Sequence, residues 1–309
     1  MSKTTVTLIW PSIAPVLKQE INSSILPTHL KKLIKKSSFT ADESRFQRLL
    51  INQFSDDISG SDIPLAGLYG DNLLFADPCH LHPDRDRLVL FSDDLDITQS
   101  ERLGLAAEVQ PLLDEFGAKL LVNTAEQHWL LQFDNMPDLI LTSLEDVSGK
   151  GVDDSLPQGN DRKHWLRLLN EIQMQLYSAE VNKKRTEQGK LPINSLWFWG
   201  MGDLALQADK WSAIVGTDYL LSVLAKNSKA ALHPEVNYSD VSIKGAYLHV
   251  LDEVALNSDW QQQLDNVDDE ILKPLWNQCK QAKISSVKLH IPDYGYFALT
   301  PFDCWKFWR

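Results

Sequence analysis

Apolar positions after residue 160 recur at two spacings, one typical of helices and one typical of strands. The clearest helical spacing begins after Asn160 and Asp161, either of which can cap the free N–H groups of a first turn. One face of that helix consists of Trp165, Leu168, Leu169, Ile172 and Leu176. Strands then alternate with helices: strands are predicted at 193–199, 212–216, 246–251 and 286–291, and helices at 218–227 and 258–282. This alternation predicts an α/β fold with a doubly wound, mostly parallel sheet.

The first half of the chain has a different pattern. Residues 5–10 alternate as a strand and stop at Pro11, and residues 12–57 are helical in pieces. The segment between them and residue 160 contains short strands at 73–75, 88–91, 119–123 and 129–133, with a helix at 99–116. We therefore expect residues 1–60 and 160–309 to form an α/β core, and residues 61–159 to form a smaller α+β lobe. Pro274 is expected to interrupt the helix at 258–282.

Charge narrows the possible partners. The 309 residues carry a formal net charge of -12 at pH 7, which repels nucleic-acid phosphates. The dense basic runs are residues 31–36 and 183–185, and the first has the spacing of a solvated helix face. No apolar stretch approaches the ~20 residues needed to span a membrane, and the N-terminal apolar run is too short for a secretory signal. We expect a cytoplasmic protein that binds neither nucleic acid nor membranes; the oligomeric state is left open.

Cysteine spacing and catalytic motifs give little support for ordinary catalysis. Cys79, Cys279 and Cys304 lie far apart in sequence, without a Cys-x-x-Cys pair, and are interpreted as buried or incidental thiols. The chain contains no Gly-x-Ser-x-Gly elbow and no His-Glu-x-x-His motif. Hydrolase chemistry of these kinds is therefore not indicated.

His80 and His82 form a possible metal-binding pair. Two positions apart on a strand, they would face the same way and could hold a metal ion. Because prolines flank them, we expect instead a bent loop with solvated histidines. Arg85 and Arg87, next in the chain, could meet a phosphate or carboxylate, or pair with neighbouring aspartates.

A second candidate site follows the strand at 193–199. Trp197 and Trp199 lie on one strand face, and Gly200 and Gly202 after them allow backbone N–H groups to approach a ligand. The segment lacks the third glycine of a dinucleotide fingerprint and the Gly-Lys-Ser/Thr of a phosphate loop. A role for the tryptophans in the core is the alternative.

Three phrases of the sequence carry a family resemblance. They are Leu-Leu-Asn-Glu-Ile-Gln-Met at 168–174, Val-Asn-x-x-Arg at 181–185 and Asn-Ser-Leu-Trp-x-Trp-Gly-x-Gly at 194–202, together with the segment 76–86. In these the chain resembles bacterial cofactor-independent phosphoglycerate mutase-like proteins, some of them described as regulators of pathogenicity factors. Their wider relatives are the archaeal-type mutases of the alkaline phosphatase superfamily. The resemblance implies an alkaline phosphatase-like core with an inserted substrate lobe.

The metal ligands of those mutases are where this chain departs from the family. The mutases hold two divalent metals through an Asp-Gly turn after the first strand, an Asp-x-x-Gly-His and an Asp-His near the C-terminus. Here the first strand ends at Trp10-Pro11-Ser12 without a carboxylate, the acids after His249 have no histidine behind them, and Tyr294 stands where the family shows histidine. A paired-metal site needs several converging carboxylates and imidazoles, so we expect no metal cofactor and no catalytic residue.

The leading hypothesis is a catalytically degenerate phosphoglycerate mutase-like protein that binds an anionic small molecule or a protein partner in a regulatory role. The residues expected to line its pocket are Asp77, His80, Arg85, Asn182, Arg185, Asn194, Trp199 and Gly202. The first alternative is an active metal-dependent mutase, with two ions such as Mn²⁺ or Zn²⁺ on Asp252, Asp293, His249 and His290. Since the two histidines fall on neighbouring predicted strands, we expect them to be able to approach each other. The second alternative is an interaction module that uses the aromatic tail at 301–309.

Overall fold

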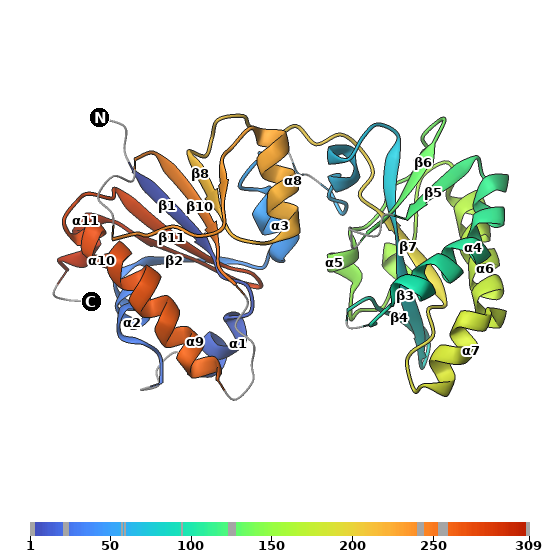
Figure 1. Cartoon of the computed structure of the whole chain (residues 1–309), viewed down its shortest axis with the longest axis horizontal. Coiled ribbons are helices and arrows are strands. Elements are labelled where there is room, and N and C mark those ends of the chain that lie inside the picture. The colour runs from blue at the N-terminus through green and yellow to red at the C-terminus, as the bar shows by residue number, and fades with distance from the viewer. Residues whose placement is uncertain are drawn as a thin grey trace. The chain divides into compact units, whose positions relative to one another are not determined.

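The chain divides into two compact units, of which the first is made of two separate stretches of the sequence and the second of one. The computed structural model describes residues 4–20, 25–56, 58, 60–93, 95–122, 128–239, 244–252 and 259–306. Residues 1–56 and 206–309 make up the first unit, and residues 57–205 make up the second. Figure 1 labels their helices and strands.

The first unit is built on a mixed seven-stranded sheet. Its strands are β1 (Thr5–Ile9), β2 (Ser38–Asp42), β8 (Ala213–Val215), β9 (Leu232–His233), β10 (Ala246–Val250), β11 (Ser286–Ile291) and β12 (Tyr294–Leu299). The order across the sheet is β2-β12-β11-β1-β10-β8-β9. The five strands from β11 to β9 are parallel, and β12 and β2 add an antiparallel edge. The predicted α/β class with a parallel sheet is confirmed at this level.

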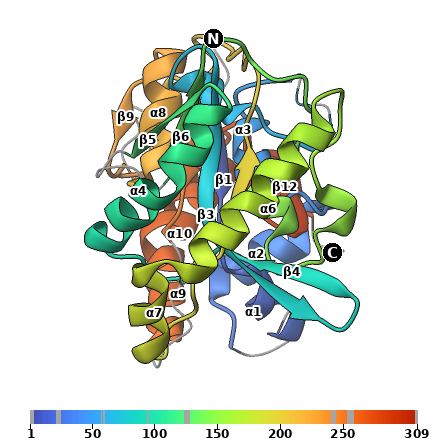
Figure 2. The same ribbon diagram turned by 90° about the vertical axis from the view of Figure 1, so that its right-hand side faces the viewer.

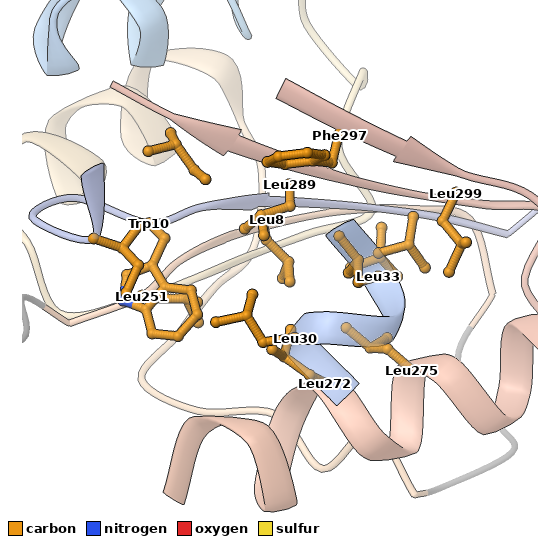
Figure 3. Close-up of a cluster of buried hydrophobic side chains, with 14 of the residues drawn as sticks. Leu8, Trp10, Leu30, Leu33, Leu251, Leu272, Leu275, Leu289, Phe297 and Leu299 are labelled. Atoms are coloured by element: carbon orange, nitrogen blue, oxygen red, sulfur yellow. The ribbon is translucent and has the colours of Figure 1, made fainter. Parts of the chain in front are cut away.

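Helices flank this sheet. They are α1 (Ala14–Glu20), α2 (Thr28–Lys36), α3 (Phe46–Ile51), α8 (Tyr219–Ser228), α9 (Trp260–Val267), α10 (Lys273–Lys280) and α11 (Pro301–Cys304). Leu8 of β1 and Leu289 of β11 are paired in register, and both point into a core that receives Leu30 and Leu33 from α2 and Leu275 from α10 (Figure 3). The same core contains Trp10, directly after β1, which is fully buried. This core fixes which side chains of β1 point toward α2.

The start of α2 is capped by a distant carboxylate. Pro27 precedes the helix and offers no side-chain acceptor. Asp268 accepts instead from the backbone N–H groups of His29 (3.1 Å) and Leu30 (2.7 Å), and from His29 Nδ1 (2.9 Å). These bonds satisfy N–H groups that a helix start leaves without partners, and they place a negative charge at the positive end of the helix.

Asp268 is the first residue of a π-helical turn, η3 (Asp268–Leu272), between α9 and α10. The turn lies just before Pro274, which has no N–H to donate to the preceding turn. The predicted helix at 258–282 is therefore observed over 260–280, with its irregularity in the turn before the proline. The wider turn is the element that presents Asp268 to α2.

The second unit contains an antiparallel sheet. Its strands are β3 (Leu73–Asp84), β4 (Arg87–Phe91), β5 (Ala118–Val122), β6 (Trp129–Phe133) and β7 (Ser195–Trp199). The sheet order is β4-β3-β6-β5, and β7 also pairs with β3. Its helices are η1 (Leu65–Leu68), α4 (Gln99–Glu115), α5 (Leu144–Val147), η2 (Asp153–Ser155), α6 (Arg162–Ser178) and α7 (Glu180–Glu187). Leucines and a tryptophan of α4 and α6 pack on one face of the sheet, the face nearer the viewer in Figure 2.

Two expectations from the sequence differ from this arrangement, one on the domain boundary and one on the segment around His80. Residues 160–205 were expected in the larger lobe but belong to the second unit, because β7 is hydrogen-bonded to β3 from Phe75 to Cys79 and α6 packs on the same sheet. The bent loop expected around His80 is also wrong, because residues 73–84 form one continuous strand. Pro78 and Pro83 are accommodated within that strand.

Of the three cysteines, Cys79 and Cys279 are buried, as expected, and Cys304 is half-buried with its thiol donating to the carbonyl of Thr300 at 3.6 Å. Within the described parts of the chain, no helix is long and apolar enough to cross a membrane.

Replacing Asp268 by alanine is expected to lower the free energy of unfolding by about 2 kcal/mol, because it removes the cap of α2 and leaves the N–H groups of His29 and Leu30 buried without acceptors. Urea denaturation of the purified variant measures this. The neighbouring exposed pair of Asp269 with Lys273 supplies the control, since Asp269→Ala should change stability by less than about 0.5 kcal/mol. Equal effects of the two substitutions would contradict the capping role.

Candidate functional site

Asp77 is the centre of a buried polar cluster in the second unit. It lies on β3 with only 4% of its surface exposed. Its Oδ2 accepts from Trp199 Nε1 and from His128 Nδ1, each at 2.7 Å, and its Oδ1 accepts from the backbone N–H of Trp129 at 3.2 Å. The buried carboxylate is therefore satisfied by three donors from the chain itself. Asp77 and Trp199, both expected in a pocket, do lie together.

Aromatic rings surround His128 of this cluster. The ring centroid of Phe75 lies 4.8 Å from that of His128, and that of Trp199 lies 5.5 Å from it. Phe75 and Trp199 contact each other at 4.7 Å, and Tyr69 meets Phe75 edge-on at 5.6 Å. A carboxylate that fixes one imidazole nitrogen sets the ring's orientation, as in sites where histidine moves a proton. Sequence reasoning missed His128, since 51 positions separate it from Asp77.

The backbone N–H groups of the glycine segment after β7 bind a carboxylate of the same chain, that of Asp62. The backbone N–H of Gly200 donates to both carboxylate oxygens of Asp62 (2.9 and 2.8 Å), and that of Met201 donates to Oδ2 (3.0 Å). Ser143 Oγ also donates to Asp62, at 3.2 Å. The backbone donors expected for a ligand are therefore occupied by Asp62, a residue that the sequence analysis did not single out. Burial raises the pKa of Asp62 to about 6, although these hydrogen bonds act in the opposite direction.

Gly202 lies at a small open pocket beside this segment. The pocket has a volume of about 310 Å³ and is lined in part by Asp62, Pro64, Ile140, Met201, Gly202 and Asp203. Gly202 has a φ of 114°, a conformation that favours glycine, and Gly200 has a φ of 82°. A Cβ atom on Gly200 would lie 2.5 Å from the Phe75 ring, so that glycine is needed for packing.

Arg185 is a buried structural residue in this fold. Its guanidinium is fully buried and donates to the carbonyls of Leu191, Asp96 and Leu95 at 2.9, 3.3 and 2.5 Å. It also forms an ion pair with Glu101 at 3.0 Å. These partners tie α7 to the segment before α4. The guanidinium that was expected to attract an anion is thus engaged by the protein.

The two asparagines of the expected site also bridge backbone segments. Asn182 donates through Nδ2 to the carbonyls of Leu176 and Ile193, and its Oδ1 accepts from the N–H of Ile193, all at 2.8 Å. Asn194 pairs with both backbone groups of Leu81, accepting at 2.7 Å and donating at 2.9 Å. Asn182 joins the end of α6 to the approach to β7, and Asn194 continues the β3–β7 pairing by one side chain.

His80 and Arg85 lie farther along β3. His80 is buried, and its Nδ1 donates to the carbonyl of Pro192 at 2.8 Å. Arg85 is exposed in the turn between β3 and β4, with a φ of 57°. Arg87 pairs with Asp84 at 3.3 Å. The structure therefore groups the predicted residues in several places: Asp77 with Trp199, His80 near Asn194, Asn182 and Arg185 on α7, and Arg85 and Gly202 apart.

The histidines of the alternative metal site lie on opposite faces of the first unit's sheet. β1 lies between their strands, and His249 is paired in register with Leu8, whereas His290 is paired with Ile9. Since successive residues of a strand point to opposite faces, His249 points with Leu8 into the α2 side and His290 points with Ile9 away from it. The expectation that the two imidazoles approach each other is wrong.

Each histidine has a local aromatic partner. The Tyr238 hydroxyl lies 3.2 Å from His249 Nδ1, and His290 stacks on Tyr296 with ring centroids 4.9 Å apart. Burial lowers the pKa of both histidines to about 4, so both are neutral near pH 7. Both histidines thus pack against an aromatic ring, and Nδ1 of His290 is buried without a hydrogen-bond partner among the described residues.

The acids of that alternative site are also separate. Asp252 follows β10 and lies 3.4 Å from Thr217 Oγ1, and Asp293 is exposed in the turn between β11 and β12 with a φ of 58°. Within the described ranges, no group of three or more His, Cys, Asp or Glu is placed to hold a metal ion. Residues 253–258 after Asp252 lie outside the described residues.

Comparison with known proteins gives partial matches to one group of enzymes. No family model matches the chain. A segment of 113 residues is 30% identical to the 2,3-bisphosphoglycerate-independent phosphoglycerate mutase of Methanosarcina mazei, covering 34% of this chain and 28% of that enzyme. A segment of 61 residues is 39% identical to the enzyme of the same description from Methanosarcina acetivorans, covering 20% and 15%. The chain thus spans less than a third of the length of these relatives.

Among solved structures, the cofactor-independent phosphoglycerate mutase from Thermoplasma acidophilum aligns over 97% of this chain and 90% of its own, with 15% identity and a TM-score of 0.45. The sequence matches establish homology to cofactor-independent phosphoglycerate mutases at low identity and over part of the chain.

The raised pKa of Asp62 makes a defined contribution to pH-dependent stability. A carboxyl with a pKa of about 6 in the folded state, against 3.8 for the ordinary group, stabilises the fold below pH 4. That contribution is lost as the pH rises through about 6, because the unfolded chain releases its proton first. In Asp62→Asn the contribution is absent. We expect the unfolding free energy of the native protein, minus that of the variant, to fall by roughly 2–3 kcal/mol between pH 4 and pH 7.

Urea unfolding of both proteins across that pH range measures the difference. Asp203→Asn, at a residue that also lines the 310 Å³ pocket and is exposed, is the control and should give a difference nearly independent of pH. A flat profile for Asp62→Asn would show that the buried carboxylate does not titrate as described.

Proposed function

We propose that this protein is a catalytically degenerate phosphoglycerate mutase-like protein, related to the bacterial proteins described as regulators of pathogenicity factors, and that it acts by binding an anionic ligand or a protein partner. The homology to the mutases supports its descent. The five parallel strands of the first unit, with helices on either side, support a core of the doubly wound alkaline phosphatase-like kind (Figure 1).

The observation that carries this proposal is the register of β1 with its two neighbours. A paired-metal centre for phosphoryl transfer holds its ions ~3.5–4 Å apart between converging carboxylates and imidazoles. His249 and His290 instead point to opposite faces of the same sheet. Trp10, directly after β1, is buried in the core where a carboxylate would be needed in a mutase. The residues present therefore do not fit a metal pair.

A binding role is supported by lysines beside the start of α4. A pocket of about 220 Å³ is lined by Thr98, Ser100, Glu101, Val181, Lys184, Gln188 and Lys190. Lys190 also pairs with Asp96 at 2.7 Å. Arg185 is engaged by the protein and pairs with Glu101 of the lining, so Lys184 and Lys190 are the cationic residues of the lining that offer charge to a small phosphate or carboxylate.

A second candidate function rests on the aromatic tail. Phe302 is 67% exposed and Trp305 is 53% exposed, although Trp305 Nε1 donates to the Lys280 carbonyl at 3.2 Å. Exposed aromatic side chains of this size are frequent anchors at protein interfaces. Residues 307–309 of the proposed interaction segment lie outside the described residues.

The proposal predicts that the purified protein does not interconvert 3-phosphoglycerate and 2-phosphoglycerate, with or without added Mn²⁺, Zn²⁺ or Mg²⁺. An enolase-coupled assay measures this, with the Methanosarcina mazei enzyme as the positive control. Metal-dependent turnover that is abolished by His249→Asn or by His290→Asn would establish the active-enzyme alternative and overturn the proposal.

For the binding role, we expect 3-phosphoglycerate or inorganic phosphate to bind to the intact protein, measured by isothermal titration calorimetry. The double substitution of Lys184 and Lys190 by alanine should weaken the affinity by at least about tenfold, equivalent to about 1.4 kcal/mol. The matched control is Lys183→Ala, since Lys183 is exposed and pairs with Glu180 instead. Unchanged affinity in the double variant would rule out this pocket.

A further inference from the structure

His80 has one ring nitrogen with a partner and one without. Only 7% of the residue is exposed, and Nδ1 lies 2.8 Å from the carbonyl oxygen of Pro192. Nε2 is fully buried and has no hydrogen-bond partner in the described part of the chain. A buried polar atom without a partner is costly, so its persistence calls for a physical explanation.

The Pro192 contact fixes the tautomer of His80. A carbonyl oxygen can only accept, so the proton of the neutral ring is on Nδ1. Nε2 then carries a lone pair and is an acceptor or a metal ligand. A ring N–H donated to a backbone carbonyl, with the other nitrogen left for a metal, is the usual arrangement around metal-binding histidines.

A second imidazole lies beside the ring of His80. His82 is two residues further along β3, hence on the same face of the strand, and it is exposed to solvent. The ring centroids of His80 and His82 are 5.9 Å apart. Two imidazoles on one tetrahedral ion, with metal–nitrogen bonds of about 2.0–2.1 Å, have ring centres roughly 5 Å apart. The observed separation is about 1 Å longer than that, so the exposed His82 ring moves toward His80 when an ion binds.

The surroundings shield His80 and leave His82 open to solvent. The ring of Phe91 on β4 lies 6.4 Å from that of His80 and 6.3 Å from that of His82. It is paired in register with His80 and so lies on the same face. The apolar ring limits water on one side, while His82 keeps an open approach for an ion.

We infer that His80 and His82 form a binding site for one transition-metal ion of the nickel, copper and zinc group, with water completing the coordination. Neutral imidazoles suit these ions, and two of them on one strand hold the ion without a protein carboxylate. The site lies in the second unit, whereas His249 and His290 lie in the first. It therefore stands whether or not the proposed loss of mutase activity is correct.

Titration of the untagged, chelator-treated protein with Zn²⁺ in a calorimeter tests the inference. One saturable equivalent is expected, and it should be lost in His80→Asn and in His82→Asn. When the chelator-treated native protein is loaded with Cu²⁺ in place of Zn²⁺, its electron paramagnetic resonance spectrum should show splitting from two imidazole nitrogens. His164→Asn is the matched control, because His164 is an exposed histidine of the same unit whose ring lies 4.1 Å from that of Phe116, and its loss should leave Zn²⁺ binding unchanged.

His82→Asn decides the outcome even where His80→Asn fails to fold, because His82 is exposed and its replacement leaves the buried ring in place. Circular dichroism confirms that each variant is folded. Absence of saturable Zn²⁺ binding to the folded native protein, or binding that is unchanged in His82→Asn, would overturn the inference. Binding lost in His249→Asn or His290→Asn but retained in His82→Asn would also overturn it, and would assign the ion to the first unit.

Discussion

The alternation of side chains along β1 is the constraint on which the first unit depends. Because β1 is hydrogen-bonded on both sides, by β10 and by β11, its pleat sets the facing of three strands at once. Leu8 points toward α2 and draws Leu289 into the same core. The same register sends His249 and His290 to opposite faces. A shift of either strand by one residue would bring the imidazoles to one face, and would also expose its core leucines, so the packing excludes it.

The second unit is dominated by the need to satisfy buried charge. Asp77, Asp62 and Arg185 are each surrounded by donors or acceptors from the chain, because a charged group buried without partners costs several kcal/mol. Side chains of these types are also what a ligand pocket would need. Residue type and local spacing cannot separate the two uses, since the partners come from distant segments. The contact of Asp62 with Gly200, for example, spans 138 positions.

The limits of sequence-based prediction follow from the same distinction. The helix predicted after Asp161 is observed at 162–178, and the parallel strands of the first unit other than the short β9 were predicted, because both are set by local periodicity. The assignment of residues 160–205 to the second unit was not predicted, because it depends on the pairing of β7 with a strand about 120 positions earlier. The prolines of β3 suggested a loop, but their missing N–H groups are tolerated within the strand. Asp62 and His128 carry no local signal at all.

Whether each polar atom has a hydrogen-bond partner within the protein distinguishes structural residues from binding residues better than residue type does. Arg185 and Asn182 have several good partners within the protein, and a ligand would have to displace bonds that hold α7 in place. His80 differs, because its Pro192 contact supports the ring while leaving Nε2 unused. If His80 served only the fold, an apolar side chain of the same shape would make the fold more stable, because the unpaired buried nitrogen is unfavourable. His290 also has an unpaired ring nitrogen, Nδ1, but the ring stacked on it is that of Tyr296, whereas the ring beside His80 is a second imidazole that can share an ion with it.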